Sequence, residues 1–91
     1  MSNNQEKLDK LFEQFTITAK LLPTTTTNED KLYLYGYYKQ ATQGDCNIEK
    51  PKSLFDQKSL KKWEYWEQHK GLNSNEAKKN YIKKVQSLMN S

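Results

Sequence analysis

Apolar residues in this chain recur every three or four positions, the spacing of one helix face, and no stretch alternates between apolar and polar residues as a strand does. The first such stretch predicts a helix over about residues 4–19. Its apolar face consists of Leu8, Leu11, Phe12, Phe15 and Ala19. The last stretch predicts a helix that Asn73 and its neighbours cap. Its apolar face consists of Ala77, Tyr81, Val85 and Leu88.

Turn-forming residues divide the chain between these two helices. Pro23 and four consecutive threonines predict a flexible loop over residues 22–27, because threonine has poor helix propensity and its hydroxyl favours local turns. Thr27 and the acidic residues after it resemble a capping box, and Gly44 is the residue type that usually ends a helix. A second helix is therefore predicted over about residues 28–43.

An irregular connection is predicted over residues 44–57, and a third helix over about residues 57–69. The connection is long enough to let the third helix run parallel to the second. Gly36 lies inside the second helix, where glycine costs about 1 kcal/mol relative to alanine, so we expect close approach by a backbone or ligand, or tight helix packing. The predicted fold class is all-α, with four helices.

Length and composition predict one small domain with a thin core. A chain of 91 residues does not divide into two cores, and only 34% of its residues are hydrophobic. All fifteen basic residues are lysines, and they outnumber eleven acidic residues for a net charge of +4. Lysine binds phosphate well but lacks the planar fork that reads guanine edges, which disfavours base-specific DNA recognition and favours a phosphorylated small molecule.

The cysteine count and the N-terminal sequence bear on the compartment. Cys46 is the single cysteine, which excludes an intramolecular disulfide, a zinc quartet and a Cys-x-x-Cys pair. The first residues are polar and lead into the first predicted helix without an apolar run of signal-peptide or membrane-spanning length. We therefore expect a soluble protein in the cytoplasm.

Two tyrosines and a lysine of the second predicted helix share one face. Tyr35, Tyr38 and Lys39 stand at i, i+3 and i+4, so two phenol rings and an ammonium group converge on one patch. Such a patch suits an aromatic base joined to phosphate. Lys62 is a second lysine, beside Trp63 and Trp66, of which at least one should be buried, and Tyr81 adds a further ring. From these residues alone, the rings belong either to a site or to the core, and both lysines are either ligand groups or solvated charges.

No catalytic constellation is visible in the sequence. His69 is the only histidine, lies near a predicted helix end, and is expected to be solvated. Asp45 follows Gly44 and is expected to be a turn residue, and Cys46 is expected to be inert. There is no glycine-rich phosphate loop and no metal-ligand cluster in the sequence, so we expect neither an enzyme nor a cofactor.

Three motifs in this order resemble those of the acyl-CoA-binding protein family. The second-helix motif is Leu34-Tyr35-Gly36-Tyr37-Tyr38-Lys39-Gln40-Ala41-Thr42, followed by Gly44-Asp45 and Asn47. The third-helix motif consists of Lys62-Trp63, Trp66 and Lys70-Gly71, and the fourth-helix motif of Glu76-Ala77, Tyr81-Ile82 and Val85. The chain departs from the family pattern in its long threonine loop, at Thr16, where many members carry lysine, and at Lys52, which replaces a frequent glycine.

The resemblance implies a single acyl-CoA-binding domain over residues 1–91, built as a four-helix bundle with up-down-down-up topology. It implies that Tyr35, Lys39 and Lys62 hold the 3′-phosphate of CoA, and that Tyr38 and Tyr81 line the nucleotide and thioester region. The implied function is to bind and carry long-chain acyl-CoA esters as an intracellular pool former and transporter, without catalysis. The protein would act as a monomer, in transient contact with membranes or acyl-CoA-using enzymes.

Two other functions stay open at this point. A basic helical module could bind nucleic acid or an anionic membrane through its lysine-rich last two helices, although the first thirty residues carry five acidic residues and only three lysines. A helix bundle that binds other proteins and leaves its cleft empty is the third possibility.

Overall fold

The computed structural model describes residues 3–52 and 56–90, and these residues form helices and no strand. The elements are α1 over Asn3–Thr18, a short 3₁₀-helix η1 over Ala19–Leu21, α2 over Asn28–Gln43, α3 over Gln57–Glu67 and α4 over Ser74–Met89. The predicted all-α class with four helices is confirmed.

The third helix ends earlier than the sequence predicted, at Glu67 instead of near residue 69. The backbone tightens there: the N–H groups of His69 and Lys70 donate to carbonyls three residues earlier, at 3.1 and 3.0 Å. Gly71 follows with φ +90°, which a helix does not contain. The residues after Glu67 therefore form a tight turn and not a further turn of α-helix.

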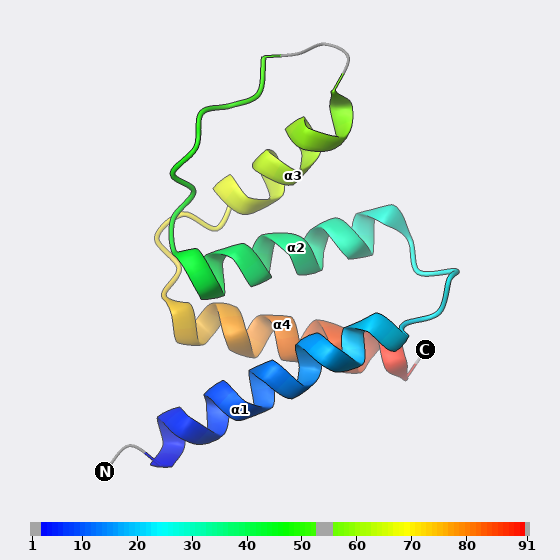
Figure 1. Cartoon of the computed structure of the whole chain (residues 1–91), viewed down its shortest axis with the longest axis vertical. Helices are drawn as coiled ribbons and strands as arrows, with labels where there is room; N and C mark the ends of the chain where they lie inside the picture. The colour runs from blue at the N-terminus through cyan, green and yellow to red at the C-terminus, as the bar shows by residue number, and fades with distance from the viewer. Residues whose placement is uncertain (1–2, 53–55, 91) are drawn as a thin grey trace.

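The four α-helices lie side by side in the order α3, α2, α4, α1 (Figure 1). α1 and α4 run in one direction, and α2 and α3 run in the opposite direction (Figure 1). The long connection after α2 returns the chain to the other end of the bundle, which allows α3 to be parallel to α2. The up-down-down-up topology is confirmed.

Three helices begin at side-chain caps, and two of these caps, Thr27 and Asn73, were predicted from the sequence. Thr27 accepts a hydrogen bond from the backbone N–H of Asp30 at 3.0 Å, and Asn73 accepts one from Glu76 at 2.8 Å. Asp56 caps α3 in the same way. Each cap satisfies a backbone donor that the first turn of a helix leaves without a partner.

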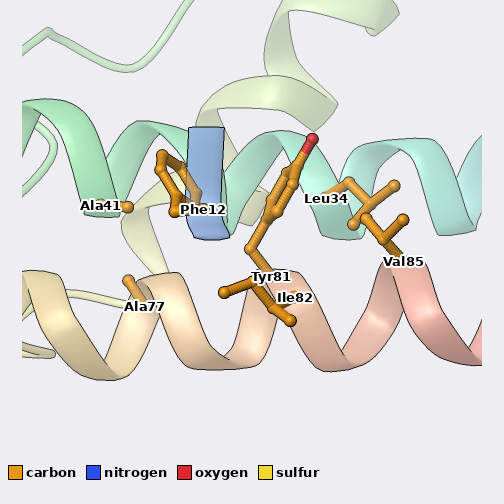
Figure 2. Close-up of a cluster of buried hydrophobic side chains, with 7 residues drawn as sticks. All are labelled: Phe12, Leu34, Ala41, Ala77, Tyr81, Ile82 and Val85. Atoms are coloured by element: carbon orange, nitrogen blue, oxygen red, sulfur yellow. The ribbon is translucent and has the colours of Figure 1, made fainter. Parts of the chain in front are cut away.

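The core lies between α2 and α4, with α1 closing it on one side (Figure 2). Its buried side chains are Phe12 from α1, Leu34 and Ala41 from α2, and Ala77, Tyr81, Ile82 and Val85 from α4. Leu34 and Ala41 turn to the core, which leaves the opposite side of α2 available for α3 and for a ligand. No described helix has the length and apolarity needed to cross a bilayer.

α3 rests directly on the backbone of α2 at Gly36. A Cβ atom built on Gly36 would lie 2.3 Å from the carbonyl oxygen of Tyr65. Of the explanations that the sequence left open for this glycine, close approach of another backbone is therefore correct. This contact sets the distance between the two helices that carry the predicted site.

Candidate functional site

A pocket of about 860 Å³ opens between the N-terminal halves of α2 and α3. Its volume lies within the range of about 300–1,000 Å³ that is typical of small-molecule sites. α2 contributes Asn28, Glu29, Lys31, Leu32 and Tyr35, and α3 contributes Gln57, Lys58, Lys61, Lys62 and Tyr65. The pocket combines two aromatic rings and a leucine with four lysines.

Tyr35 and Lys62 face each other across this pocket. The ammonium nitrogen of Lys62 lies 5.3 Å from the centre of the Tyr35 ring, a distance at which a cation and an aromatic face attract each other. Burial, and to a smaller extent the neighbouring Cys46, raise the pKa of Tyr35 above its ordinary value. The phenol therefore keeps its proton at neutral pH and can donate to an anion that Lys62 also contacts.

Lys39 lies one helical turn after Tyr35 and rests on the indole of Trp66. Its ammonium nitrogen is 4.9 Å from the ring centre. Trp66 is buried, with 2% of its surface exposed, and its indole N–H donates to the carbonyl of Gly44 at 2.8 Å. The prediction that at least one of the two tryptophans is buried is therefore confirmed. The ring of Trp66 is also the surface over which Lys39 lies.

Neither Lys39 nor Lys62 forms an ion pair within residues 3–52 and 56–90. The lysines that do form ion pairs are Lys78, Lys79 and Lys84, all on α4. Both cations of the α2–α3 side are therefore available to a bound anion. Both ammonium groups and the Tyr35 hydroxyl are of the kind that donates to anions.

Tyr38 and Tyr81 meet where α2 packs against α4. Their ring centres are 6.2 Å apart, and both rings pack against Phe12. Tyr38 is 42% exposed, whereas Tyr81 is 5% exposed and belongs to the core. Burial, and to a smaller extent Tyr38, raise the pKa of Tyr81, so this phenol also stays protonated. Tyr38 is accessible to a ligand, and Tyr81 lies beneath it with its hydroxyl at the end of the ring farthest from α4 (Figure 2).

The five predicted site residues therefore form two contacting pairs, and one lysine lies apart from both pairs. Tyr35 contacts Lys62, and Tyr38 contacts Tyr81. Lys39 joins them only through its place on the same face of α2 and through Trp66. Of the five residues, Tyr35 and Lys62 line the pocket.

Sequence reasoning missed most of the α3 lining of the pocket. Lys58, Lys61, Lys62 and Tyr65 stand at i, i+3, i+4 and i+7, which is one helix face. This spacing was visible in the sequence, but of these three lysines only Lys62 was predicted as a site residue. Leu32 and Lys31 complete the opposite wall on α2.

The expectation that His69 is solvated was wrong. Its ring stacks on Tyr37 with centres 4.0 Å apart, and its Nε2 atom is buried without a hydrogen-bond partner. Burial lowers the pKa of His69 below its ordinary value of 6.5. The tight turn after α3 places the ring against α2, which helical spacing alone did not predict.

Asp45 acts as a structural residue at the end of α2. Its carboxylate accepts the backbone N–H of Gly71 at 2.8 Å and the side-chain amide of Gln40 at 2.9 Å. These hydrogen bonds, the first named being the larger contribution, lower the pKa of Asp45. The carboxylate ties the turn after α3 to α2, in agreement with its interpretation as a turn residue. No group of three or more potential metal ligands occurs in the described part of the chain.

Comparison with known proteins gives the same family in sequence and in structure. The family model described as acyl CoA binding protein matches residues 9–85. The acyl-CoA-binding domain-containing protein 1 of Oryza sativa subsp. japonica is 46% identical over 82 residues, which cover 90% of this chain and 89% of the relative. The acyl-CoA-binding protein of Ricinus communis is 45% identical over 78 residues, 86% of each chain.

A solved structure shows the same fold. The crystal structure of Oryza sativa acyl-CoA-binding protein 2 matches this structure with a TM-score of 0.91 and 42% sequence identity, covering 96% of this chain and 94% of that one. Sequence, topology and the helix contacts that form the pocket thus lead to one conclusion. The chain belongs to the acyl-CoA-binding protein family.

Proposed function

We propose that this chain binds long-chain acyl-CoA thioesters reversibly and carries them without changing them chemically. The observation that carries the proposal is that Lys62 lies against Tyr35 in the pocket and Lys39 follows one helical turn later on α2, neither in an ion pair with a described carboxylate. Family membership supports this function and gives no support to the nucleic-acid alternative.

The head of the ligand is assigned to the C-terminal side of the pocket. Lys39, Lys62 and the Tyr35 hydroxyl would donate to the 3′-phosphate of CoA, and hydrogen bonds to charged groups contribute roughly 1.5–3 kcal/mol each. Tyr38 offers an exposed ring to the nucleotide and thioester region, and Tyr81 supports that ring from the core.

The acyl tail is assigned to the pocket between α2 and α3. Leu32 and the rings of Tyr35 and Tyr65 supply apolar surface, and lysine side chains bury their alkyl stems along such surfaces while their charges stay in water. Transfer of each CH₂ group out of water contributes about 0.8 kcal/mol. The tail therefore contributes through transfer out of water and the head through hydrogen bonds to charged groups. Neither part alone should bind well.

The proposed role is that of a cytoplasmic carrier. The single cysteine, Cys46, supports a reducing compartment, and the absence of a nucleophile–base pair from the predicted site residues supports binding without catalysis. A monomer that releases its ligand to membranes or to acyl-CoA-using enzymes is the simplest form of this role.

Titration calorimetry with three ligands tests the proposal. Palmitoyl-CoA should bind much more tightly than either free CoA or free palmitate, because only the ester engages both the lysines and the apolar pocket. All ligands are used below their critical micelle concentrations. Palmitate binding as tightly as its CoA ester would instead indicate a fatty-acid carrier.

A further inference from the structure

The pocket between α2 and α3 contains more positive charge than the CoA 3′-phosphate requires. Four lysines line it, and Glu29 is the one acidic residue in the lining. Lys62 is already assigned to the phosphate. The three others are Lys31 on α2 and Lys58 and Lys61 on α3, all exposed.

These three additional lysines have no partner within the described residues. No ion pair, side-chain hydrogen bond or ring contact joins the ammonium group of Lys31, Lys58 or Lys61 to a described group. The nearby carboxylate of Asp56 accepts the backbone N–H of Ser59 and caps α3, and its charge acts on Lys62. With four lysines against Glu29 and Asp56, the pocket keeps a net positive charge.

The pocket becomes more polar with distance from the proposed head site. α2 and α3 run in the same direction (Figure 1). Of the lining residues, Tyr35 and Tyr65 therefore stand at one end of the pocket, and Asn28, Glu29, Gln57 and Lys58 at the other. The seven steps from Tyr35 back to Asn28 correspond to roughly 10 Å of helix at 1.5 Å per residue. An acyl tail that leaves the head site along this pocket ends among amides and charges.

We infer that this pocket accepts acyl-CoA thioesters whose acyl chain carries a carboxylate at its far end, as in monothioesters of long-chain dicarboxylic acids. The inference rests on the proposed function and names a second ligand class for the same pocket. Lys58 and Lys61 receive the distal carboxylate, with Lys31 opposite them on α2. Leu32 and Tyr65 contact the methylene groups between the two polar ends.

The expected effect of each lysine is modest, because all three are exposed. Ion pairs of exposed groups change an equilibrium by up to about fivefold each, so two lysines together contribute on the order of tenfold. In an apolar pocket without these lysines, the distal carboxylate would lose its hydration without compensation. The test is therefore a ratio of two affinities and not a single affinity.

The experiment measures binding of palmitoyl-CoA and of hexadecanedioyl-CoA, which have the same number of acyl carbons, by calorimetry. The proteins are the wild type, the double variant Lys58→Gln/Lys61→Gln, and the control Lys10→Gln/Lys83→Gln. The control changes the net charge equally at two exposed lysines, on α1 and α4, that do not line the pocket. Melting curves establish that all three proteins are folded.

The wild type should bind the two thioesters with affinities within about tenfold of each other, and the Lys58/Lys61 variant should shift that ratio against hexadecanedioyl-CoA by on the order of tenfold. The control should leave the ratio unchanged. If the Lys58/Lys61 variant bound both thioesters more weakly by the same factor, these lysines would belong to the CoA phosphates and the inference would be overturned. An unchanged ratio without any weakening would overturn it as well. Failure of palmitoyl-CoA itself to bind would refute the proposed function as well.

Discussion

Replacing Gly36 with alanine tests the contact between α2 and α3. The new Cβ atom would lie 2.3 Å from the carbonyl oxygen and 2.8 Å from the carbonyl carbon of Tyr65, whereas ordinary contacts begin at 3.4 Å. The two helices would have to separate by about 1 Å, since 3.4 minus 2.3 is 1.1. The obstacle is backbone, which has no side-chain rotamer to relieve the overlap.

Two opposing effects determine the size of the change. Overpacking in a well-packed region costs typically about 1–3 kcal/mol, and a backbone clash belongs in the upper half of that range. Alanine in place of glycine inside a helix returns about 1 kcal/mol. The net destabilisation is then about 1–2 kcal/mol, which lowers the Tm of a domain of this size by about 4–16 °C.

Thermal unfolding followed by circular dichroism measures this change, with Ser87→Ala at an exposed position of α4 as the control. The control should keep or slightly raise the Tm. Gly36→Ala should also weaken acyl-CoA binding, because a displaced α3 moves Lys62 away from Tyr35. If Gly36→Ala raised the Tm as helix propensity alone predicts, Tyr65 would not lie against Gly36 and the described packing would be wrong.

Three further results follow from the structure. Palmitoyl-CoA at a hundredfold excess over Kd should stabilise the fold by about 2.7 kcal/mol and raise the Tm by about 10 °C or more; an unchanged Tm counts against the proposed function. Burial favours the neutral form of His69, so its pKa is lower in the folded state than the unfolded value of 6.5. The contribution of neutral His69 to the free energy of unfolding is therefore fully present above pH 6.5 and is lost as the pH falls through the folded-state pKa. His69→Leu should remove this part of the Tm–pH profile, and an identical profile would contradict the burial of His69. Asp45→Ala should lower the Tm more than Asp9→Ala, because it removes an acceptor from Gln40 and from Gly71; the reverse order would argue against the Asp45 contacts.

The helices and their caps were predictable because they depend on neighbours in sequence. Periodicity located the first and last helices, and turn-forming and capping residues bounded the two between them. Thr27 and Asn73 cap their helices through residues three positions later. The same local rules failed after α3, where the turn at residues 68–71 depends on the carboxylate of Asp45, 26 positions away from Gly71. His69 was placed in solvent for the same reason: its partner, Tyr37, lies on another helix.

The candidate site was predicted in part. The shared face of Tyr35, Tyr38 and Lys39 follows from helical spacing, but their partners come from other helices and needed either the family resemblance or the structure. Tyr81 illustrates this, because its spacing on α4 fits the core and a ligand site equally well. The structure gives it a place in the core next to Tyr38. The lysine face of α3 was readable in the sequence, but only the position of α3 over α2 shows that it lines a pocket.

Binding of palmitoyl-CoA and its 3′-dephospho analogue by the wild type, Lys39→Ala and Lys62→Ala tests the central claim most directly. The wild type should bind the dephospho ester poorly, and each alanine variant should bind palmitoyl-CoA about 10- to 150-fold more weakly, because each removes a hydrogen bond to a charged group. The variants should also discriminate much less between the two ligands, as a double-mutant cycle requires for groups in direct contact. Equal affinity of the wild type for both esters would contradict the assignment of these lysines to the 3′-phosphate.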